Sequence, residues 1–369
     1  RPPRSTPLYS SAASDVYKRQ PLYWDNRPKV NIAQDQLLVI DHELAFRSDT
    51  EPLKDIYDNG NMAIIHGIGF DNSPRSHFRA MDIWHTCEPD SIGIDGWLGN
   101  VILDLDPGGQ NVLQGVFLGQ GLPRALTMRG VPVTSVNHLP SYGVLSSNPG
   151  ITSEQERDQL LESFARMYAP AIGTGPTMEY LGQAGRDALR GADIIRVAPE
   201  SYSSNVEYAD SPIARRLRDV AQVHLAGLGT QVFYTSHGPF DTHFDQGGSH
   251  TKIWMEVSAA ISDFFVDLRE HDAADEVVMM VFSEFGRRAH DNGSGTDHGA
   301  AGATFLIGNQ VKGGLYGEYP SAKSEDLEQG DLVPNWDFRS DYTSIVEDWL
   351  GMDANPIVNG NFEKMAILK

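Results

Sequence analysis

The stretch that decides the fold is Met62-Ala63-Ile64-Ile65, a compact apolar run that ends in His66-Gly67. Four segments further along the chain share its character, because each is short, apolar and bounded by glycine or polar residues. They are residues 116–118, 232–234, 277–282 and 304–307. Strands that are apolar throughout, rather than alternating, are typical of a parallel sheet buried on both faces. The sequence therefore predicts a central, mostly parallel sheet.

Amphipathic helices separate these runs. Their apolar faces lie over residues 160–168, 257–268 and 342–349. Ser153 and Glu156 form a capping box before the first, and we expect Ser340 to cap the last and Gly351 to end it. Strands that alternate with helices predict an α/β fold, with the sheet sandwiched by helices.

The first twenty residues differ from the rest of the chain. They carry four basic residues against one acidic residue, whereas the whole chain has a formal net charge of −21. They show neither a helix or strand period nor the apolar core of a secretory signal. The string SSAASDVYKRQ resembles a translated sequencing adaptor, so we expect residues 1–20 to be a non-native or disordered tail. No linker interrupts residues 21–369, which we expect to form a single domain.

The composition narrows the classes of partner. A net charge of −21 argues against binding to nucleic acid, which usually needs a basic face. No apolar run is long enough to span a bilayer. Cys87 is the single cysteine, so a disulfide within the chain is impossible, and we expect this thiol to be buried.

Polar residues follow the apolar runs, where ligands gather in open parallel sheets. The candidates are Arg75, Ser76 and Arg79 after the first run, Asp241, His243 and His250 after the third, Glu284 after the fourth, and Asp297 and His298 before the last. Carboxylates together with imidazoles are ligands for Zn²⁺, Mn²⁺ or Mg²⁺. A hydroxyl at a helix start suits attack on an anionic ester, and the two arginines would contact the same oxygens.

Each candidate also has a plainer interpretation. The Asp241-x-His243 pair is compatible with a hydrogen-bonded loop, and Ser76 with a helix N-cap. Glu284 can form an ion pair with Arg287 or Arg288, and His298 can occupy a turn. His237 and His250 are compatible with structural roles. The interpretation as a site depends on all the clusters lying at strand edges of one chain.

Several strings resemble one bacterial family, domain of unknown function 1501. They are RSHFRAMDIWHT, GWLG, FDTHFDQ, FSEFGRR, GTDHG, VKGGLYGEYP and DFRSDYTSIVEDWLG, and the similarity runs from about Tyr23 to Leu350. That family is similar to the alkaline phosphatase and sulfatase superfamily. The resemblance implies an alkaline-phosphatase-like α/β fold with a metal site at the strand ends, and export by the twin-arginine route, whose signal this chain does not carry.

The resemblance also implies roles for individual residues. Ser76 takes the place of the nucleophile, Asp241 and His243 take the place of the first metal-ligand pair, and His250 is an alternative imidazole. Glu284 stands where the superfamily has a later aspartate, and His298, with Asp297 beside it, stands at the late histidine. Two features depart from the pattern. Phe285 occupies the place of a histidine, and the first strand, with its aspartate, would precede Tyr23.

These considerations predict an exported or periplasmic, metal-dependent hydrolase of phosphate or sulfate esters, using Zn, Mn, Mg or Ca. Its expected partner is a small anionic ester or a sulfated or phosphorylated glycan. Two alternatives stay open. One is a non-catalytic envelope or polysaccharide-binding protein on the same scaffold, and the other is a metal-dependent isomerase or transferase.

Overall fold

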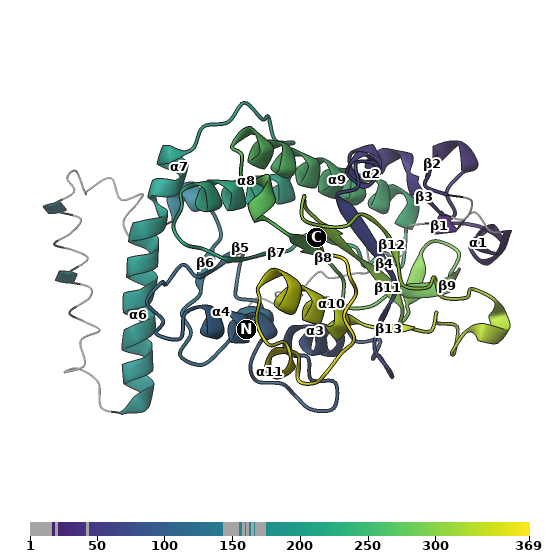
Figure 1. Ribbon diagram of the computed structural model, residues 1–369. Coiled ribbons are helices and arrows are strands. Elements are labelled where there is room, and N and C mark those ends of the chain that lie inside the picture. The colour runs from purple at the N-terminus through teal and green to yellow at the C-terminus, as the bar shows by residue number, and fades with distance from the viewer. Residues whose placement is uncertain are drawn as a thin grey trace. The chain divides into compact units, whose positions relative to one another are not determined.

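A computed structural model describes residues 17–18, 21–41, 44–142, 155–156, 159, 162–163, 166 and 175–369 (Figure 1). The chain divides into two compact units. One comprises Arg1–Gly93, Val206–Arg215 and His237–Lys369, and the other comprises Ile94–Asn205 and Arg216–Ser236. Whether they belong to the single domain expected from the sequence stays a prediction.

The five-stranded sheet of the first unit is built around β4 (Met62–Gly69), all eight residues of which are buried. Its strand order is β12-β4-β11-β8, and β13 also pairs with β4. These strands are β8 (Met279–Val281), β11 (Gly302–Ile307), β12 (Gly314–Tyr316) and β13 (Trp336–Asp337). β11 runs antiparallel to β4 and β8, whereas β12 and β13 run parallel to β4.

The prediction of one mostly parallel sheet is therefore wrong in two respects. The sheet around β4 is mixed, and the runs at 116–118 and 232–234 form a separate sheet in the second unit. That sheet has the order β6-β5-β7 and is parallel, with strands β5 (Gly115–Leu118), β6 (Thr134–Val136) and β7 (Val232–Thr235). A continuous apolar run predicts a strand that is buried on both faces. It does not indicate the direction of that strand or the neighbouring strand with which it pairs.

Helices and short strands complete both units. The first unit contains α1 (Pro21–Asn26), α2 (Glu51–Asp58), α3 (His77–Thr86), α9 (Gln246–Glu270), α10 (Phe338–Ser344), a π-helix (Ile345–Trp349), α11 (Asn355–Val358), and the strands β1 (Tyr17–Lys18), β2 (Leu37–Val39), β3 (Leu44–Arg47), β9 (Arg287–Asp291) and β10 (Thr296–His298). The second contains α4 (Trp97–Leu105), α6 (Pro176–Ile195) and α7 (Val197–Ser201), and α8 (Pro212–Leu225) continues from the first unit into the second. Short 3₁₀ turns lie at Gln34–Gln36, Ser48–Thr50, Arg124–Leu126, Leu139–Ser141, Ala274–Glu276 and Ser324–Asp326.

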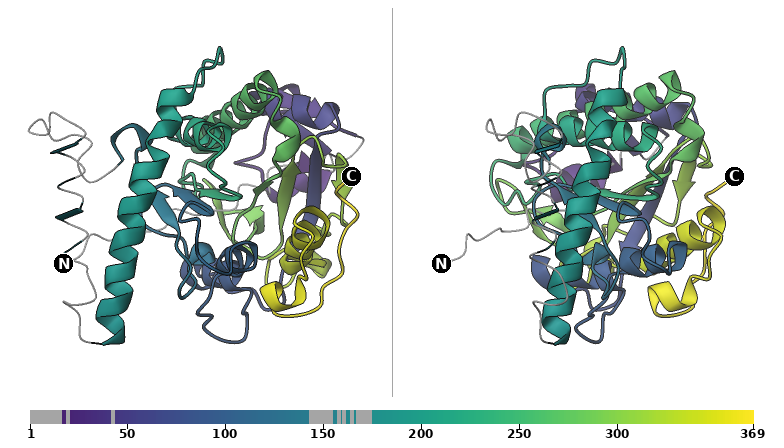
Figure 2. Two further views of the ribbon diagram at one scale, coloured as in Figure 1. Left: turned by 60° about the vertical axis from the view of Figure 1, so that its left-hand side comes forward. Right: turned by 90° about the vertical axis from the view of Figure 1, so that its left-hand side faces the viewer.

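Two of the three helices expected from the sequence lie wholly within the described residues, and both have counterparts in the structure. α9 contains the apolar face at 257–268 and packs against α2, where the backbone N–H of Leu53 donates to Ser258 Oγ at 3.1 Å (Figure 2). The last helix begins earlier than expected, because Asp337, not Ser340, accepts from the N–H of Arg339 as the N-cap. The capping box at Ser153 lies outside the described residues.

The buried side of α3 and α10 is aromatic. Trp84 of α3 stacks on Phe338 of α10 with ring centroids 4.4 Å apart, and on Phe282 at 5.3 Å. The hydroxyl of Tyr342 donates to the carbonyl of Trp84, so the polar end of that ring is satisfied. This packing holds α3, whose first residue is His77, in a fixed position.

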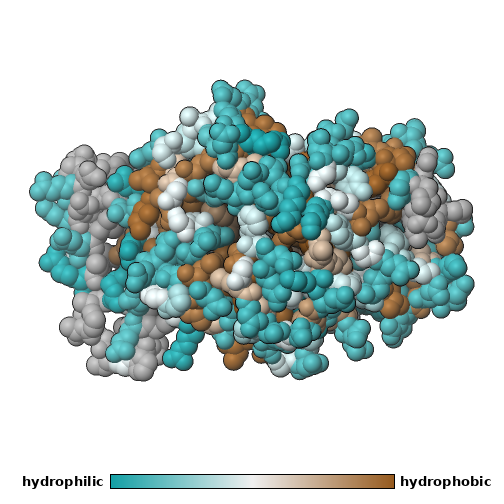
Figure 3. All heavy atoms as spheres, in the orientation of Figure 1, coloured by the Kyte–Doolittle hydropathy of each residue, from teal (hydrophilic) through white to brown (hydrophobic). Residues whose placement is uncertain are grey.

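Hydrophilic side chains cover most of the face shown in Figure 3, and apolar ones form small separate patches on it. Within the described part of the chain, no helix combines the length and apolar character that crossing a bilayer requires. Cys87 is buried, as expected, and burial raises the pKa of its thiol.

Asp341 is a carboxyl group inside this core. It is fully buried on α10, and the hydroxyl of Thr304 on β11 donates to its Oδ2. Its Oδ1 has no hydrogen-bond partner within the described chain. Burial raises the pKa of Asp341 from 3.8 to about 7, since the charged form loses its hydration.

This burial predicts a pH-dependent stability. The unfolded carboxyl loses its proton near pH 4 and the folded one near pH 7, so the free energy of unfolding should fall between these values and then level off. Asp341→Asn removes the titration, and urea unfolding should show it more stable than wild type at pH 8 by a few kcal/mol. Equal pH profiles for the two proteins would contradict the prediction.

Candidate functional site

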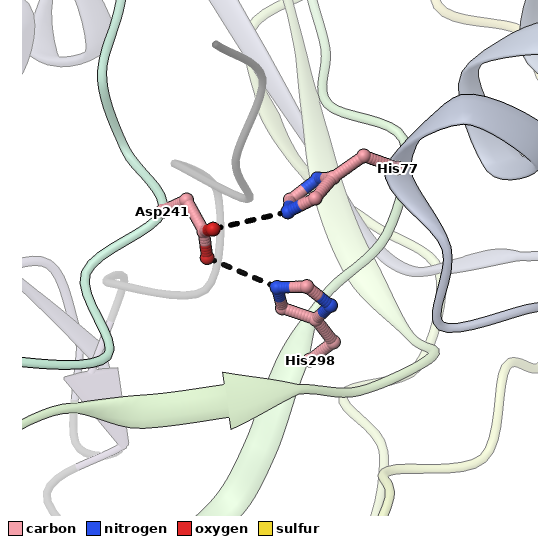
Figure 4. A group of neighbouring side chains, drawn as sticks. All are labelled: His77, Asp241 and His298. Carbon is pink, nitrogen blue, oxygen red and sulfur yellow. Dashed lines mark hydrogen bonds and ion pairs between the residues drawn. The ribbon is translucent and has the colours of Figure 1, made fainter. Parts of the chain in front are cut away.

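The carboxylate of Asp241 is the centre of a group of polar side chains in the first unit. Its Oδ1 lies 3.0 Å from His298 Nε2, 3.0 Å from His243 Nε2 and 2.7 Å from a guanidinium nitrogen of Arg287. Its Oδ2 lies 3.1 Å from His77 Nε2. Figure 4 shows the rings of His77 and His298 directed at the two oxygens of this carboxylate. Asp241, His77, His243 and His298 are called the histidine cluster below.

The members of the histidine cluster come from separate segments. His77 is the first residue of α3, His298 is the last residue of β10, and Asp241 and His243 lie in the loop between β7 and α9. One ligand atom from each of His77, Asp241 and His298 lies within 4.8 Å of those of the other two, so these three side chains are close enough to hold one metal ion. His243 is the more exposed member, with 44 % of its side chain accessible.

Each histidine also makes a polar contact through its other ring nitrogen, Nδ1. His77 Nδ1 lies 2.7 Å from Glu284 Oε1, and His243 Nδ1 lies 3.0 Å from Asp297 Oδ1. His298 Nδ1 donates to the backbone carbonyl of Arg75 at 2.8 Å. A carboxylate or carbonyl behind each ring is the usual arrangement of metal-binding histidines, because it fixes the tautomer and orients the free nitrogen.

These outer contacts determine where the ring hydrogens lie. The carbonyl of Arg75 can only accept, so His298 Nδ1 carries a hydrogen, and in the neutral ring Nε2 carries a lone pair. The same reasoning applies to His243 against the carboxylate of Asp297. Yet the Nε2 atoms of His243 and His298 lie 2.9 Å apart, beside the same oxygen of Asp241.

Lone pairs that face one another and a carboxylate repel, so added positive charge would stabilise the cluster. One proton between the close histidine pair and one on Nε2 of His77 would provide two charges, and one divalent cation provides the same amount. With neutral histidines, the three carboxylates and the one guanidinium of this group sum to a formal charge of −2. The donor set and its charge therefore both fit a divalent metal ion.

The pKa shifts agree with this charge distribution. Hydrogen bonds to Asp241 and Glu284 raise the pKa of His77 to about 9, although partial burial opposes the shift. Burial alone would raise the pKa of Asp241, but hydrogen bonds from His298, His77 and Arg287 lower it far below its usual range. Hydrogen bonds from His243 and Asn292 lower the pKa of Asp297. The site thus concentrates negative charge beside imidazoles.

A buried arginine side chain holds Asp241 and the backbone around the cluster in place. Arg287 is 1 % exposed and donates to the carbonyls of Phe240 at 3.1 Å and Thr296 at 2.8 Å, as well as to Asp241. Glycine permits the close approach of these segments. A Cβ on Gly286 would lie 1.6 Å from the Ala301 carbonyl oxygen, a clash that no rotamer change removes.

The residues predicted from the sequence fall into two layers. Asp241, His243 and His298 lie in the cluster, whereas Glu284 and Asp297 lie behind its histidines. His250, the alternative imidazole, does not join them. It is buried on α9, where its Nε2 lies 2.7 Å from Thr242 Oγ1.

The arginines around the start of α3 differ from expectation. The guanidinium of Arg75 pairs with Asp331 at 2.8 Å, and it is the carbonyl of Arg75 that contacts the cluster. Arg79 pairs with Asp82 and donates to loop carbonyls at residues 88, 89 and 91, so it braces a loop. Ser76 is exposed and directly precedes α3, and its side chain makes no capping hydrogen bond.

Sequence reasoning missed two residues of the site, although both lie inside motifs that it selected. His77 directly follows Ser76, and its place at the helix start was the available signal. Arg287 was considered as a partner of Glu284, but it pairs with Asp241, and Glu284 pairs with His77. Phe285 packs against two rings, with centroids 5.0 Å from His77 and 4.8 Å from His298.

Residues 177–342 match the model of a family described as "Protein of unknown function (DUF1501)", which supports the resemblance based on the motifs. The match includes Asp241, His243, Glu284 and His298, and it begins after His77. No curated protein and no solved structure matched the chain.

The burial of Arg287 predicts a large difference between two adjacent arginines. Arg287→Ala leaves Asp241 without its closest cation and two carbonyls without a donor, so it should destabilise the fold by about 3 kcal/mol. Arg288 is 34 % exposed and lies 3.5 Å from Asp331, so Arg288→Ala should cost under about 1 kcal/mol. Chemical denaturation measures both, and equal losses would refute the role assigned to Arg287.

Proposed function

We propose that this chain is an exported, metal-dependent hydrolase of phosphate or sulfate esters. The observation that carries the proposal is the histidine cluster, in which three imidazoles turn Nε2 toward Asp241 while an acceptor holds each Nδ1. The export and the ester class come from the resemblance to the alkaline phosphatase and sulfatase superfamily, and this step is by analogy, since a fold does not determine a reaction.

The donor set narrows the metals expected at this site. Calcium and magnesium prefer oxygen ligands, whereas zinc and other first-row transition metals accept imidazole nitrogen. His77 and His298 offer nitrogen, and Asp241 offers a carboxylate oxygen. We therefore favour zinc or manganese over the other two ions expected from the sequence. A divalent metal at such a site stabilises the negative charge that develops on an ester under attack.

Ser76 is the proposed nucleophile. It is exposed and adjacent in sequence to His77, and it directly precedes α3, a helix of ten residues. The first-turn N–H groups of a helix have no partners within the helix, and the positive end of its dipole attracts anions. An anionic ester bound there would place its central atom near this hydroxyl. The backbone of Arg75 orients His298 at the same time.

Metal binding should depend on the residues of the histidine cluster and not on the number of histidines in the chain. Calorimetric titration of the chelator-treated protein with zinc should give about one equivalent, and His77→Ala, Asp241→Asn or His298→Ala should weaken binding more than about 100-fold. Glu284→Gln, which alters only the support behind His77, should weaken it about 10- to 100-fold. His290→Ala is the control, because His290 is an exposed histidine on β9. Unchanged affinity in the cluster variants would exclude this site.

Ser76→Ala should abolish ester turnover without changing zinc affinity or thermal stability. The side chain makes no capping hydrogen bond, so the usual cost of losing a cap, about 1 kcal/mol, should not appear. The assay is a panel of phosphate and sulfate esters with zinc or manganese. An unchanged rate would remove Ser76 from the mechanism. A wild-type protein that binds metal but turns over no ester would instead favour the non-catalytic binding protein.

A further inference from the structure

We propose that Arg75 and Arg288 form a subsite that binds a second anionic group of the substrate, a phosphate, sulfate or carboxylate. The preferred substrates would then be esters with at least two anionic groups, such as a multiply sulfated or phosphorylated glycan. This inference rests on the proposed function and specifies its substrate class. Its basis is that both guanidinium groups lie beside one carboxylate, that of Asp331.

Asp331 brings the two guanidinium groups together. Its Oδ2 accepts from Arg75 Nε at 3.0 Å and from Arg75 Nη2 at 2.8 Å, and its Oδ1 lies 3.5 Å from Arg288 Nε. Two cations around one anion leave a formal charge of +1, in a chain with a net charge of −21. Salt screens charges that lie beyond about 8 Å, so an anion close to the two arginines responds mainly to them.

Most N–H groups of this pair remain available to a ligand. Within the described part of the chain, the guanidinium of Arg288 makes no hydrogen bond. Arg75 Nη2 also donates to the carbonyl of Gln329 at 3.4 Å, whereas Arg75 Nη1 has no partner among the described residues. The side chains of Arg75 and Arg288 are 36 % and 34 % exposed, so solvent and ligands reach both. Guanidinium groups bind oxyanions through such N–H groups.

Contacts at two points connect the arginine pair with the histidine cluster. The backbone carbonyl of Arg75 lies 2.8 Å from His298 Nδ1. Asp297 Oδ1 lies 3.0 Å from His243 Nδ1, and this hydrogen bond lowers the pKa of Asp297, an effect to which the positive charge of Arg288 adds. Arg288 is thus close enough to act on a carboxylate that contacts the cluster. An ester bound at the cluster would have the arginine pair beside it, within reach of a second anionic group on the same molecule.

The simpler interpretation is an ion-pair network that only stabilises the fold. Arg75 alone neutralises the charge of Asp331, and partly exposed ion pairs contribute little to stability. The two interpretations predict different effects of Asp331→Asn on anion binding. In a subsite, the Asp331 carboxylate competes with the ligand for the same guanidinium groups, so its removal should strengthen the binding of an anion. In a purely structural network, its removal lowers the stability and leaves the affinity for anions unchanged.

The test compares propylphosphonate with alkane bisphosphonates of three to eight carbons, which place a second anionic group at increasing distances. Calorimetry with the zinc-loaded full chain should give the best-fitting bisphosphonate a Kd at least about tenfold lower than that of propylphosphonate. Arg288→Ala and Arg75→Ala should each remove most of this advantage, and Asp331→Asn should increase it. Arg215→Ala is the control and should leave the ratio unchanged, because Arg215 is an exposed arginine that pairs with Asp210 at 2.8 Å.

The outcomes separate the subsite from the proposed function. If every bisphosphonate binds only as tightly as propylphosphonate, the subsite is wrong and the hydrolase proposal stands, whereas binding of no phosphonate overturns both. An advantage that survives in both arginine variants places the second anion elsewhere and also overturns the subsite. Inorganic sulfate distinguishes a group of the substrate from a free anion. Sulfate that binds to the arginines without any bisphosphonate advantage would assign the pair to a free ion and contradict the proposal.

Discussion

One carboxylate constrains the whole site. Asp241 accepts from a buried guanidinium and also faces the Nε2 atoms of three histidines, each of which has its other nitrogen engaged. Two added positive charges, as protons or as one divalent cation, would stabilise this arrangement. Three imidazoles that face one carboxylate and one another cost free energy unless positive charge is added. The electrostatics therefore favour a binding role over a structural one.

The rest of the first unit keeps these groups from separating. Arg287 holds the loop that carries Asp241, and the absence of a side chain at Gly286 lets the chain pass against Ala301. Stacking of Trp84 on Phe338 secures α3, whose first residue supplies one imidazole. Fixed support of this kind reduces the reorganisation that ligand binding requires.

Sequence reasoning identified the chemistry of this site better than its architecture. Asp241, His243, Glu284, Asp297 and His298 lie in motifs whose residue types already suggest ligands, and all five belong to the site or its support. His77 escaped notice because Ser76 and the two arginines were selected from the same helix start. Strand direction could not be deduced, since the fully apolar run of β4 suits a parallel or an antiparallel neighbour equally. The start of α10 was misplaced because two possible caps, Asp337 and Ser340, stand three residues apart.

The central claim is that the histidine cluster holds a divalent metal ion. The most direct test is X-ray diffraction from crystals grown with zinc, measured on both sides of the zinc absorption edge. The account predicts one strong anomalous peak at the cluster, about 2.0–2.2 Å from an Nε2 atom of at least two of its histidines and from an Asp241 oxygen. A peak elsewhere, or an ordered cluster with no peak at saturating zinc, would contradict it and show that protons alone balance the charge.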